Sequence, residues 1–326
     1  MNIAIGIDLG GTNTKYGVIT ETGNIIEKLS LPTGRGGNER EILYDIAVEI
    51  EKLQKDFAVS ENKLIGVGIG IPGPVQPNGY VETCVNLNFR KVNPTEVLRK
   101  RLVNIPIWAG NDANVAALGE MWQGGGKGYK NLLFVTLGTG VGCGVVLNGE
   151  IVFGKSGLAG EIGHIIVDPN ETDRCNCGKR GCLDQFASAS GIVRNAKRIL
   201  RFSSMPSVLR NICEENLTAV QIVNAAKDGD GLAYFVVDYC MSFLGKCLAD
   251  TAYVIDPEIF VIGGGVSKAG EFLTNMIQKH YDKHISLCDD RTPVVIAQLG
   301  NDAGIYGAAK MVFDCERQKG KKNADL

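Results

Sequence analysis

This chain of 326 residues has no surplus of basic residues, because it contains 34 Lys and Arg and 36 Asp and Glu. The formal net charge of −2 provides no basic surface for nucleic acid or for an anionic membrane, because binding to either depends on clustered positive charge. Apolar residues make up 44% of the chain and charged residues 21%, as in globular domains. We therefore expect a small-molecule partner, and neither nucleic acid nor a membrane.

The sequence also lacks the features of an exported or membrane-spanning protein. Its amino terminus, MNIAIGIDLGG, has no basic region and becomes glycine-rich after about eight residues, which predicts a first strand instead of a signal peptide. No apolar run approaches the roughly 20 residues that span a bilayer. The ten cysteines fit a reducing compartment if three of them bind a metal and the others are scattered thiols. We therefore expect a cytoplasmic protein.

Histidine is scarce, with three in the chain, but one of them precedes a compact cysteine cluster. Residues 159–184, AGEIGHIIVDPNETDRCNCGKRGCLD, include His164, Cys175, Cys177 and Cys182. One imidazole and three thiolates form a tetrahedral set typical of structural zinc. A reduced cysteine cluster or a disulfide is the alternative, but this spacing favours zinc. Glu161 precedes the histidine by three residues and could contact a polar substrate.

Glycine is abundant, at 42 residues, and it gathers in short motifs at the ends of apolar runs. The segment IDLGGTNTKYGVI, around Gly10 and Gly11, predicts a strand, a tight turn and a returning strand. The segment VTLGTGVGCGVV, around Gly138 and Gly140, has the same pattern. The shared features indicate a weak internal duplication, with chance similarity of two hairpins as the alternative.

Two other strand ends carry candidate site residues. A predicted strand ends at Gly110-Asn111-Asp112, and residues 113–122 follow as a helix. Open α/β sheets bind ligands at such strand ends, although a helix cap would use the same residues. Residues 260–262 lead into Gly263-Gly264-Gly265, which could contact phosphate or nucleoside, although a simple strand–helix turn would need the same glycines.

Together these motifs resemble the ROK family (repressor, open reading frame, kinase) of sugar kinases and repressors. The family's motifs stand here in order: Asp8-Leu-Gly-Gly-Thr12 with Lys15, the Pro-Gly-Pro turn, Gly110-Asn111-Asp112, Leu137-Gly-Thr-Gly140, Glu161-Ile-Gly-His164, Cys175-x-Cys177-x-x-x-Gly-Cys182 and Gly263-Gly-Gly265. Each motif alone is weak, but the ordered set is specific and covers nearly the whole chain. Its pattern is most similar to that of the family's bacterial glucokinases.

The resemblance implies an α/β fold of the actin-like (ribonuclease H-like) type, a duplicated two-lobe ATPase or sugar kinase with a structural zinc loop. It implies a first lobe over residues 1–112, joined by a C-terminal helix over 302–315. The larger second lobe would cover residues 113–301 and contain the zinc loop. The lysine-rich tail, residues 316–326, is predicted to be disordered.

The resemblance also implies roles for single residues. Asp112 would be the catalytic base, and the sugar would be bound by Asn86, Asn111, Asp112, Glu161, His164 and Asp184. ATP with Mg²⁺ would be bound by Asp8, Gly10, Gly11, Thr12, Lys15, Gly138, Thr139, Gly140, Gly264 and Gly265, with an exposed strand lysine as the alternative for Lys15. The structural Zn²⁺ would be bound by His164, Cys175, Cys177 and Cys182. Asp184 departs from the family, which usually has a Glu there that contacts the sugar.

The implied reaction is the ATP-dependent phosphorylation of a hexose at its 6-hydroxyl, with glucose as the expected substrate. Kinases for fructose, mannose, N-acetylglucosamine or N-acetylmannosamine are the alternatives. A sugar-responsive repressor of this family would need a helix-turn-helix before the first hairpin, and the first strand is predicted to start at Asn2. We also expect a homo-oligomer, either a dimer or a tetramer.

Overall fold

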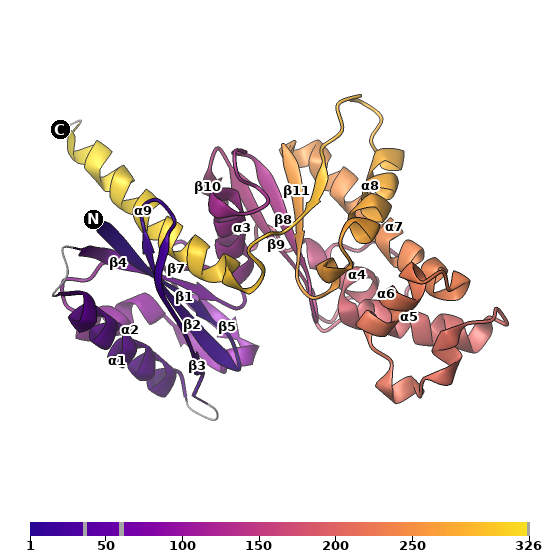
Figure 1. The fold of residues 1–326 in the computed structure, drawn as a ribbon, viewed down its shortest axis with the longest axis horizontal. Coiled ribbons are helices and arrows are strands. Elements are labelled where there is room, and N and C mark those ends of the chain that lie inside the picture. Colours follow the sequence, from indigo (N-terminus) through magenta and orange to yellow (C-terminus); the bar gives the residue numbers. More distant parts are fainter. Residues whose placement is uncertain (35–37, 59–61, 325–326) are drawn as a thin grey trace. The chain divides into compact units, whose positions relative to one another are not determined.

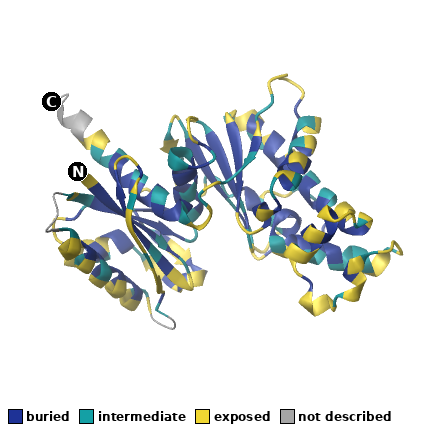
Figure 2. Ribbon diagram, in the orientation of Figure 1, coloured by how far each residue is buried: buried dark blue, intermediate teal, exposed yellow. Residues whose placement is uncertain are grey.

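The computed structural model describes residues 1–34, 38–58 and 62–324 (Figure 1). The chain forms two compact units, each of which is described by itself. The first unit contains Met1–Lys130, Gly144–Ala159 and Gln298–Leu326, and the second contains Asn131–Cys143 and Gly160–Ala297. In both units the central strands are mostly buried and the outer faces of the helices are exposed (Figure 2).

The first unit is built on a five-stranded sheet with the order β3-β2-β1-β4-β7. Its strands are β1 (Asn2–Leu9), β2 (Asn13–Thr20), β3 (Ile25–Pro32), β4 (Lys63–Ile71) and β7 (Ile107–Asn111). The first three strands are antiparallel, whereas β1, β4 and β7 are parallel. A separate hairpin consists of β5 (Val81–Cys84) and β6 (Phe89–Val92), with a short 3₁₀ turn between them. The predicted first hairpin is therefore present.

Helices cover both faces of this sheet. One face packs against α1 (Glu39–Ala58) and α2 (Pro94–Arg101), because Ile3, Ile5 and Ile7 alternate along β1 and meet the apolar sides of these helices. The other face packs against α9 (Ala303–Ala324), where Ala4 meets Ile305. Figure 1 shows α3 (Asp112–Gln123) beside α9.

Glycine allows α9 to lie directly on the sheet. A methyl group on Gly6 of β1 would overlap the carbonyl oxygen of Ile305, and one on Gly68 of β4 would overlap that of Ala308. Backbone therefore packs against backbone along this contact, which leaves no room for a side chain at either position.

The second sheet has the order β10-β9-β8-β11-β12. Its strands are β8 (Leu132–Leu137), β9 (Val141–Leu147), β10 (Glu150–Ile151), β11 (Ile259–Gly263) and β12 (Val294–Ile296), and the chain passes from the second unit into the first within β9. As in the first sheet, a hairpin is followed by two parallel strands added at the edge of its first strand. This shared order supports the predicted internal duplication.

The rest of the second unit is mainly helical. Its helices are α4 (Asp184–Ala187), α5 (Ala189–Phe202), α6 (Ala219–Lys227), α7 (Gly231–Ile255) and α8 (Glu271–His284). Contrary to the prediction that no apolar run is long enough to span a bilayer, α7 has the necessary length and composition. Most of α7 is buried against α5, α6 and α8, as expected of a core helix.

Two boundaries in the structure differ from those predicted. The prediction places α3 in the second lobe, whereas Val115 packs with Ala308 and Met311 of α9, and the first unit extends to Lys130. The prediction places a disordered tail from residue 316, whereas α9 continues to Ala324. Its last described side chains have partners, since Gln318 Nε2 donates to Glu150 Oε1 at 2.8 Å and Lys319 Nζ lies 4.7 Å from the centre of the Trp108 ring.

Candidate functional site

The carboxyl ends of the parallel strands β1, β4 and β7 meet at one edge of the first sheet. Asp8 of β1 pairs in register with Gly70 of β4, and Ile71 pairs with Asn111 of β7. Asp112 follows as the first residue of α3. This edge therefore gathers three predicted site residues at the place where open α/β sheets bind ligands.

Asp8 forms an ion pair with Lys15 on the neighbouring strand. The Lys15 Nζ lies 3.1 Å from Asp8 Oδ2, and it also donates to the carbonyl oxygen of Asn301 at 3.0 Å. The start of α9 closes the other side of Asp8, because a methyl group on Gly304 would come within 2.7 Å of its Cγ. Lys15 is therefore more than an exposed strand lysine, and its contact with phosphate stays a prediction.

The turn between β1 and β2 begins two residues after Asp8 and contains Gly10, Gly11 and Thr12. Thr33 fixes this turn, because its Oγ1 donates to the carbonyl oxygen of Gly10 at 2.7 Å and its N–H donates to that of Thr12 at 2.9 Å. A methyl group on Gly11 would lie 3.2 Å from the carbonyl oxygen of Asn86. Asn86, a predicted sugar ligand, therefore lies beside the predicted phosphate-binding turn.

Asn111 and Asp112 lie where β7 meets α3. Asn111 is buried and caps the helix, with its Oδ1 accepting from Asn114 N at 3.0 Å and its Nδ2 donating to Gly73 O and to Asp112 Oδ1, both at 3.0 Å. Asp112 is half-buried, and its Oδ1 also accepts from Ala113 N at 2.8 Å. Both Nδ2 protons of Asn111 donate hydrogen bonds, one of them to Asp112, so this side chain orients the Asp112 carboxylate.

In the second unit, the turn between β8 and β9 is the other candidate phosphate site. Gly138 N donates to the carbonyl oxygen of Gly140 at 3.0 Å, and Gly138 O accepts from Ala189 N at 2.8 Å. Thr139 lies at the tip of this turn. The turn thus places glycine backbone beside a hydroxyl, a combination suited to anion binding.

A second glycine turn follows β11, the parallel neighbour of β8. Gly264 has a φ of +84°, and a methyl group there would lie 2.6 Å from Leu137 N. The space beside Gly265 is open among the described residues. The two predicted nucleotide-binding turns of this unit therefore lie side by side at the carboxyl ends of β8 and β11.

The predicted metal ligands converge on one point. The side-chain ligand atoms of His164, Cys175, Cys177 and Cys182 all lie within 4.8 Å of one another. Cys177 Sγ lies 3.6 Å from Cys182 Sγ, and Cys175 Sγ lies 3.8 Å from His164 Nδ1. Ligands bound tetrahedrally to zinc at about 2.0–2.3 Å are separated by roughly 3.5–3.8 Å, so this spacing fits zinc. The disulfide alternative is wrong, because these cysteines are unbridged.

Gln185 braces the cysteine loop, although sequence reasoning did not identify it. Its Oε1 accepts from Gly181 N at 2.8 Å and from Cys182 N at 3.2 Å, and its Nε2 donates to Asp173 O at 3.0 Å. Because these backbone groups belong to both ends of the loop, one buried side chain fixes the loop's shape.

A buried carboxylate fixes the same loop to α5. The side chain of Glu171 is 0% exposed and lies 2.8 Å from Arg194 and 3.0 Å from Arg198. Burial raises the pKa of Glu171, but hydrogen bonds from Arg198, Asp173 N and Arg194 outweigh this effect and lower the pKa to about 2. A sequence signal existed, since two arginines four residues apart on a predicted helix share one face.

We predict that Glu171→Gln destabilises the protein near neutral pH and has a smaller effect in acid. A carboxylate with a lowered folded-state pKa stabilises above its unfolded pKa, here 4.5, and this stabilisation is lost as the pH falls toward 2. The shift corresponds to on the order of 3 kcal/mol. Urea unfolding of both proteins at about pH 7 and about pH 3 measures the difference. An equal difference at both pH values would contradict this role for Glu171.

Of the remaining predicted sugar ligands, Asp184 contacts Val141, the first residue of β9, and His164 follows a glycine that packs against the same residue. Gly163, which precedes His164, packs so closely on the Val141 carbonyl oxygen that a methyl group would overlap it. Burial raises the pKa of Glu161, and the charge of nearby His164 opposes this effect. Asp184 Oδ1 accepts from Val141 N at 2.6 Å, so its described contact is with the backbone beside the glycine turn.

The structure thus brings the predicted site residues together as two sets. The first unit holds Asp8, Gly10, Gly11, Thr12, Lys15, Asn86, Asn111 and Asp112. The second unit holds Gly138, Thr139, Gly140, Glu161, His164, Cys175, Cys177, Cys182, Asp184, Gly264 and Gly265.

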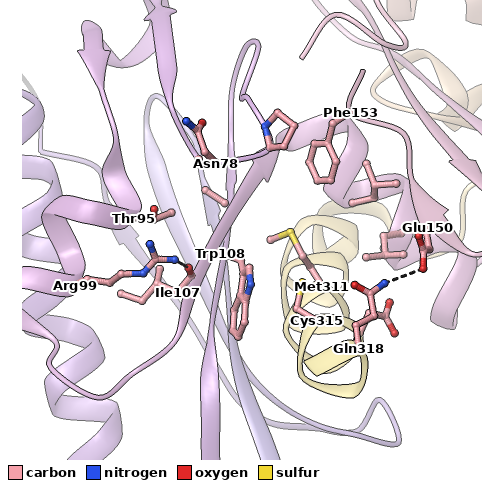
Figure 3. A pocket seen from close by; sticks show the side chains of 16 residues that line it. Asn78, Thr95, Arg99, Ile107, Trp108, Glu150, Phe153, Met311, Cys315 and Gln318 are labelled. Atoms are coloured by element: carbon pink, nitrogen blue, oxygen red, sulfur yellow. Dashed lines mark hydrogen bonds between the residues drawn. The ribbon is translucent and has the colours of Figure 1, made fainter. Parts of the chain in front are cut away.

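The first unit also contains a cavity of about 300 Å³ that sequence reasoning did not find (Figure 3). Trp108, Phe153 and Met311 contribute apolar walls, and the hydrogen bond between Gln318 and Glu150 lies at one side. None of the predicted site residues is among the described residues that line it. The cavity is therefore separate from the candidate site.

Comparison with known proteins identifies the family, since the sequence profile of the ROK family matches residues 4–314. The chain belongs to the ROK family. Among its ROK relatives, the glucokinase of Halalkalibacterium halodurans is 40% identical over 98% of this chain and 97% of its own length.

Solved ROK structures share the fold. A ROK family glucokinase from Streptomyces griseus, in complex with glucose and AMPPNP, has a TM-score of 0.76 and 31% identity, covering 95% of this chain and 98% of its own. A ROK hexokinase from Thermus thermophilus has a TM-score of 0.82 and 28% identity, covering 97% of this chain and 99% of its own. The predicted α/β fold and the resemblance to ROK sugar kinases are confirmed.

Proposed function

We propose that this protein is an ATP-dependent glucokinase that converts glucose to glucose 6-phosphate. The observation that carries the proposal is the 40% identity to a glucokinase over nearly the full length of both chains. The bound glucose and AMPPNP of the Streptomyces griseus enzyme, which shares the fold, support the same pair of substrates.

Asp112 is the proposed base. Its carboxylate takes the proton of the sugar 6-hydroxyl while that oxygen bonds to the γ-phosphorus and the bond to the β-phosphate oxygen breaks, which releases ADP. Two N–H donors, from Ala113 and Asn111, hold Asp112 Oδ1 in place. Positioning matters more than basicity here, because the transition state of phosphoryl transfer is loose.

The two glycine turns are the proposed phosphate-binding groups. The backbone N–H groups of Gly11, Thr12, Thr139 and Gly140, with the hydroxyls of Thr12 and Thr139, hydrogen-bond phosphate oxygens. Gly264 and Gly265 would flank the nucleoside, and Asp8, which is paired with Lys15, would hold Mg²⁺. When bound, Mg²⁺ neutralises charge on the β- and γ-phosphates.

The cysteine cluster is proposed to hold a structural zinc ion, since its donor set and spacing fit that metal. His164 Nδ1 faces the cluster, so its Nε2 is the nitrogen that donates to a sugar hydroxyl. Glu161 accepts from a second hydroxyl, and Asn86 and Asn111 are further candidate sugar contacts. Fixing the tautomer of His164 is therefore the main contribution of the metal to sugar binding.

A panel of sugars tests the proposal. We expect ADP release to show the highest kcat/KM with glucose, and lower values with fructose, mannose, N-acetylglucosamine and N-acetylmannosamine. A site that pairs each hydroxyl discriminates strongly, because a wrong epimer leaves buried polar groups unpaired. Coupling the product to glucose-6-phosphate dehydrogenase identifies the phosphorylated position. A preference for an N-acetylhexosamine, or no ADP release with any sugar, would overturn the glucokinase proposal.

A further inference from the structure

One short segment holds both ends of the glycine turn between β8 and β9. At the end of the turn, Val141 N donates to Asp184 Oδ1 at 2.6 Å. At its beginning, Gly138 O accepts from Ala189 N at 2.8 Å. The segment is itself closed by Ser188, whose Oγ donates to the Asp184 carbonyl oxygen at 2.6 Å. Residues 184–189 therefore act as a clamp on the turn.

The approach of Asp184 depends on a glycine. A methyl group on Gly140 would lie 2.8 Å from Asp184 Oδ1, which is closer than side chains normally approach. The carboxylate can therefore lie against the turn only because Gly140 has no side chain. The short distance from Val141 N to the carboxylate is typical of a charge-assisted hydrogen bond, the stronger class of such bonds.

The clamp is continuous with the cysteine cluster. Asp184 follows Cys182 by two residues, and Leu183 N between them donates to Ile165 O, next to His164, at 2.9 Å. Gln185, the next residue, binds the backbone of Gly181 and Cys182. The position of the Asp184 carboxylate is therefore set by the loop that carries the metal ligands.

We propose that Asp184 is a positioning residue for nucleotide binding, which acts through Val141 by fixing the Gly138–Gly140 turn. The inference rests on the proposed function, and it gives Asp184 a partner other than the sugar. A Glu at this position would be one methylene longer and could reach past the turn, whereas the shorter Asp ends at Val141 N. The metal-binding loop thereby supports the phosphate-binding turn as well as the sugar ligand His164.

Binding of AMPPNP to the sugar-free protein, measured by calorimetry, tests the proposal. We expect Asp184→Ala to weaken AMPPNP binding by about tenfold, because the turn loses a charge-assisted hydrogen bond. Asp184→Asn should weaken it by about threefold, since the amide oxygen still accepts from Val141 N but carries no charge. Asp250→Ala, which removes an exposed carboxylate on α7, is the matched control and should leave binding unchanged.

Steady-state kinetics separates nucleotide from sugar. We expect the KM for ATP to rise in both Asp184 variants while the KM for glucose stays within about twofold. Unchanged or tighter AMPPNP binding, or a rise in the KM for glucose alone, would overturn the role of Asp184. Absence of glucose phosphorylation by the wild-type protein would instead overturn the proposed function, and the calorimetric comparison would still report on the turn.

A double-mutant cycle adds a second measurement. Gly140→Ala should displace the Asp184 carboxylate and weaken AMPPNP binding, and this effect should be smaller in the Asp184→Ala background because the contact is already lost. Strictly additive effects would show that Gly140 and Asp184 act independently, contrary to the proposal.

Discussion

Asp112→Asn is expected to lower kcat by about 10²–10⁴-fold, because an amide cannot take the proton of the sugar hydroxyl. The substitution preserves shape, and an amide oxygen can still accept from Ala113 N, so the start of α3 should be retained. We expect the KM for glucose and the melting temperature to change little. Steady-state kinetics and thermal unfolding of the purified variant measure these effects.

A matched variant guards against a general effect of losing a carboxylate. Asp314→Asn makes the same change on α9 of the same unit, where the side chain pairs with Lys310. We expect its kcat to match that of the wild type. Turnover near the wild-type value in Asp112→Asn itself would remove Asp112 from the base role, whatever the control shows.

Cys177→Ala is the second substitution with a large expected effect. Removing one of four ligands should lower the zinc content from about one per chain and raise the KM for glucose by at least about tenfold, because His164 loses the metal that fixes its ring. Cys177 is exposed, so alanine leaves no buried cavity, and the effect should come from the metal. Elemental analysis and kinetics on the same preparation link the two losses.

Cys213→Ala provides the comparison for this experiment. Cys213 is also exposed and lies outside the ligand cluster, so we expect normal zinc content and activity. A metal-free Cys177→Ala protein with full activity and wild-type KM values would refute the zinc proposal.

Sequence reasoning succeeded where the decisive contacts are close along the chain. The glycine turns, the capped junction at Asn111–Asp112 and the convergence of Cys175, Cys177 and Cys182 all depend on residues a few positions apart. Local propensity and spacing therefore predicted these features, and the resemblance to the ROK family assigned them their roles.

The partners of buried polar groups could not be predicted in the same way. Glu171 meets Arg198, 27 residues later, and Asp184 meets Val141, 43 residues earlier. Such pairs depend on how distant segments fold onto one another. The extra length of α9 could not be predicted for a similar reason. Gln318 near its end donates to Glu150, which is distant in the sequence.

The contact of α9 with the first sheet constrains the order in which the two units can fold during synthesis. Gly6 and Gly68 accept the backbone of α9 near Ile305 and Ala308, so the core of the first unit is completed by a segment that is synthesised after the second unit. All residues of the second unit have been synthesised once translation has passed Ala297. During synthesis from the amino terminus, the first sheet therefore exposes an apolar face until α9 has been made, and transiently exposed apolar surface of this kind makes a folding chain prone to aggregation.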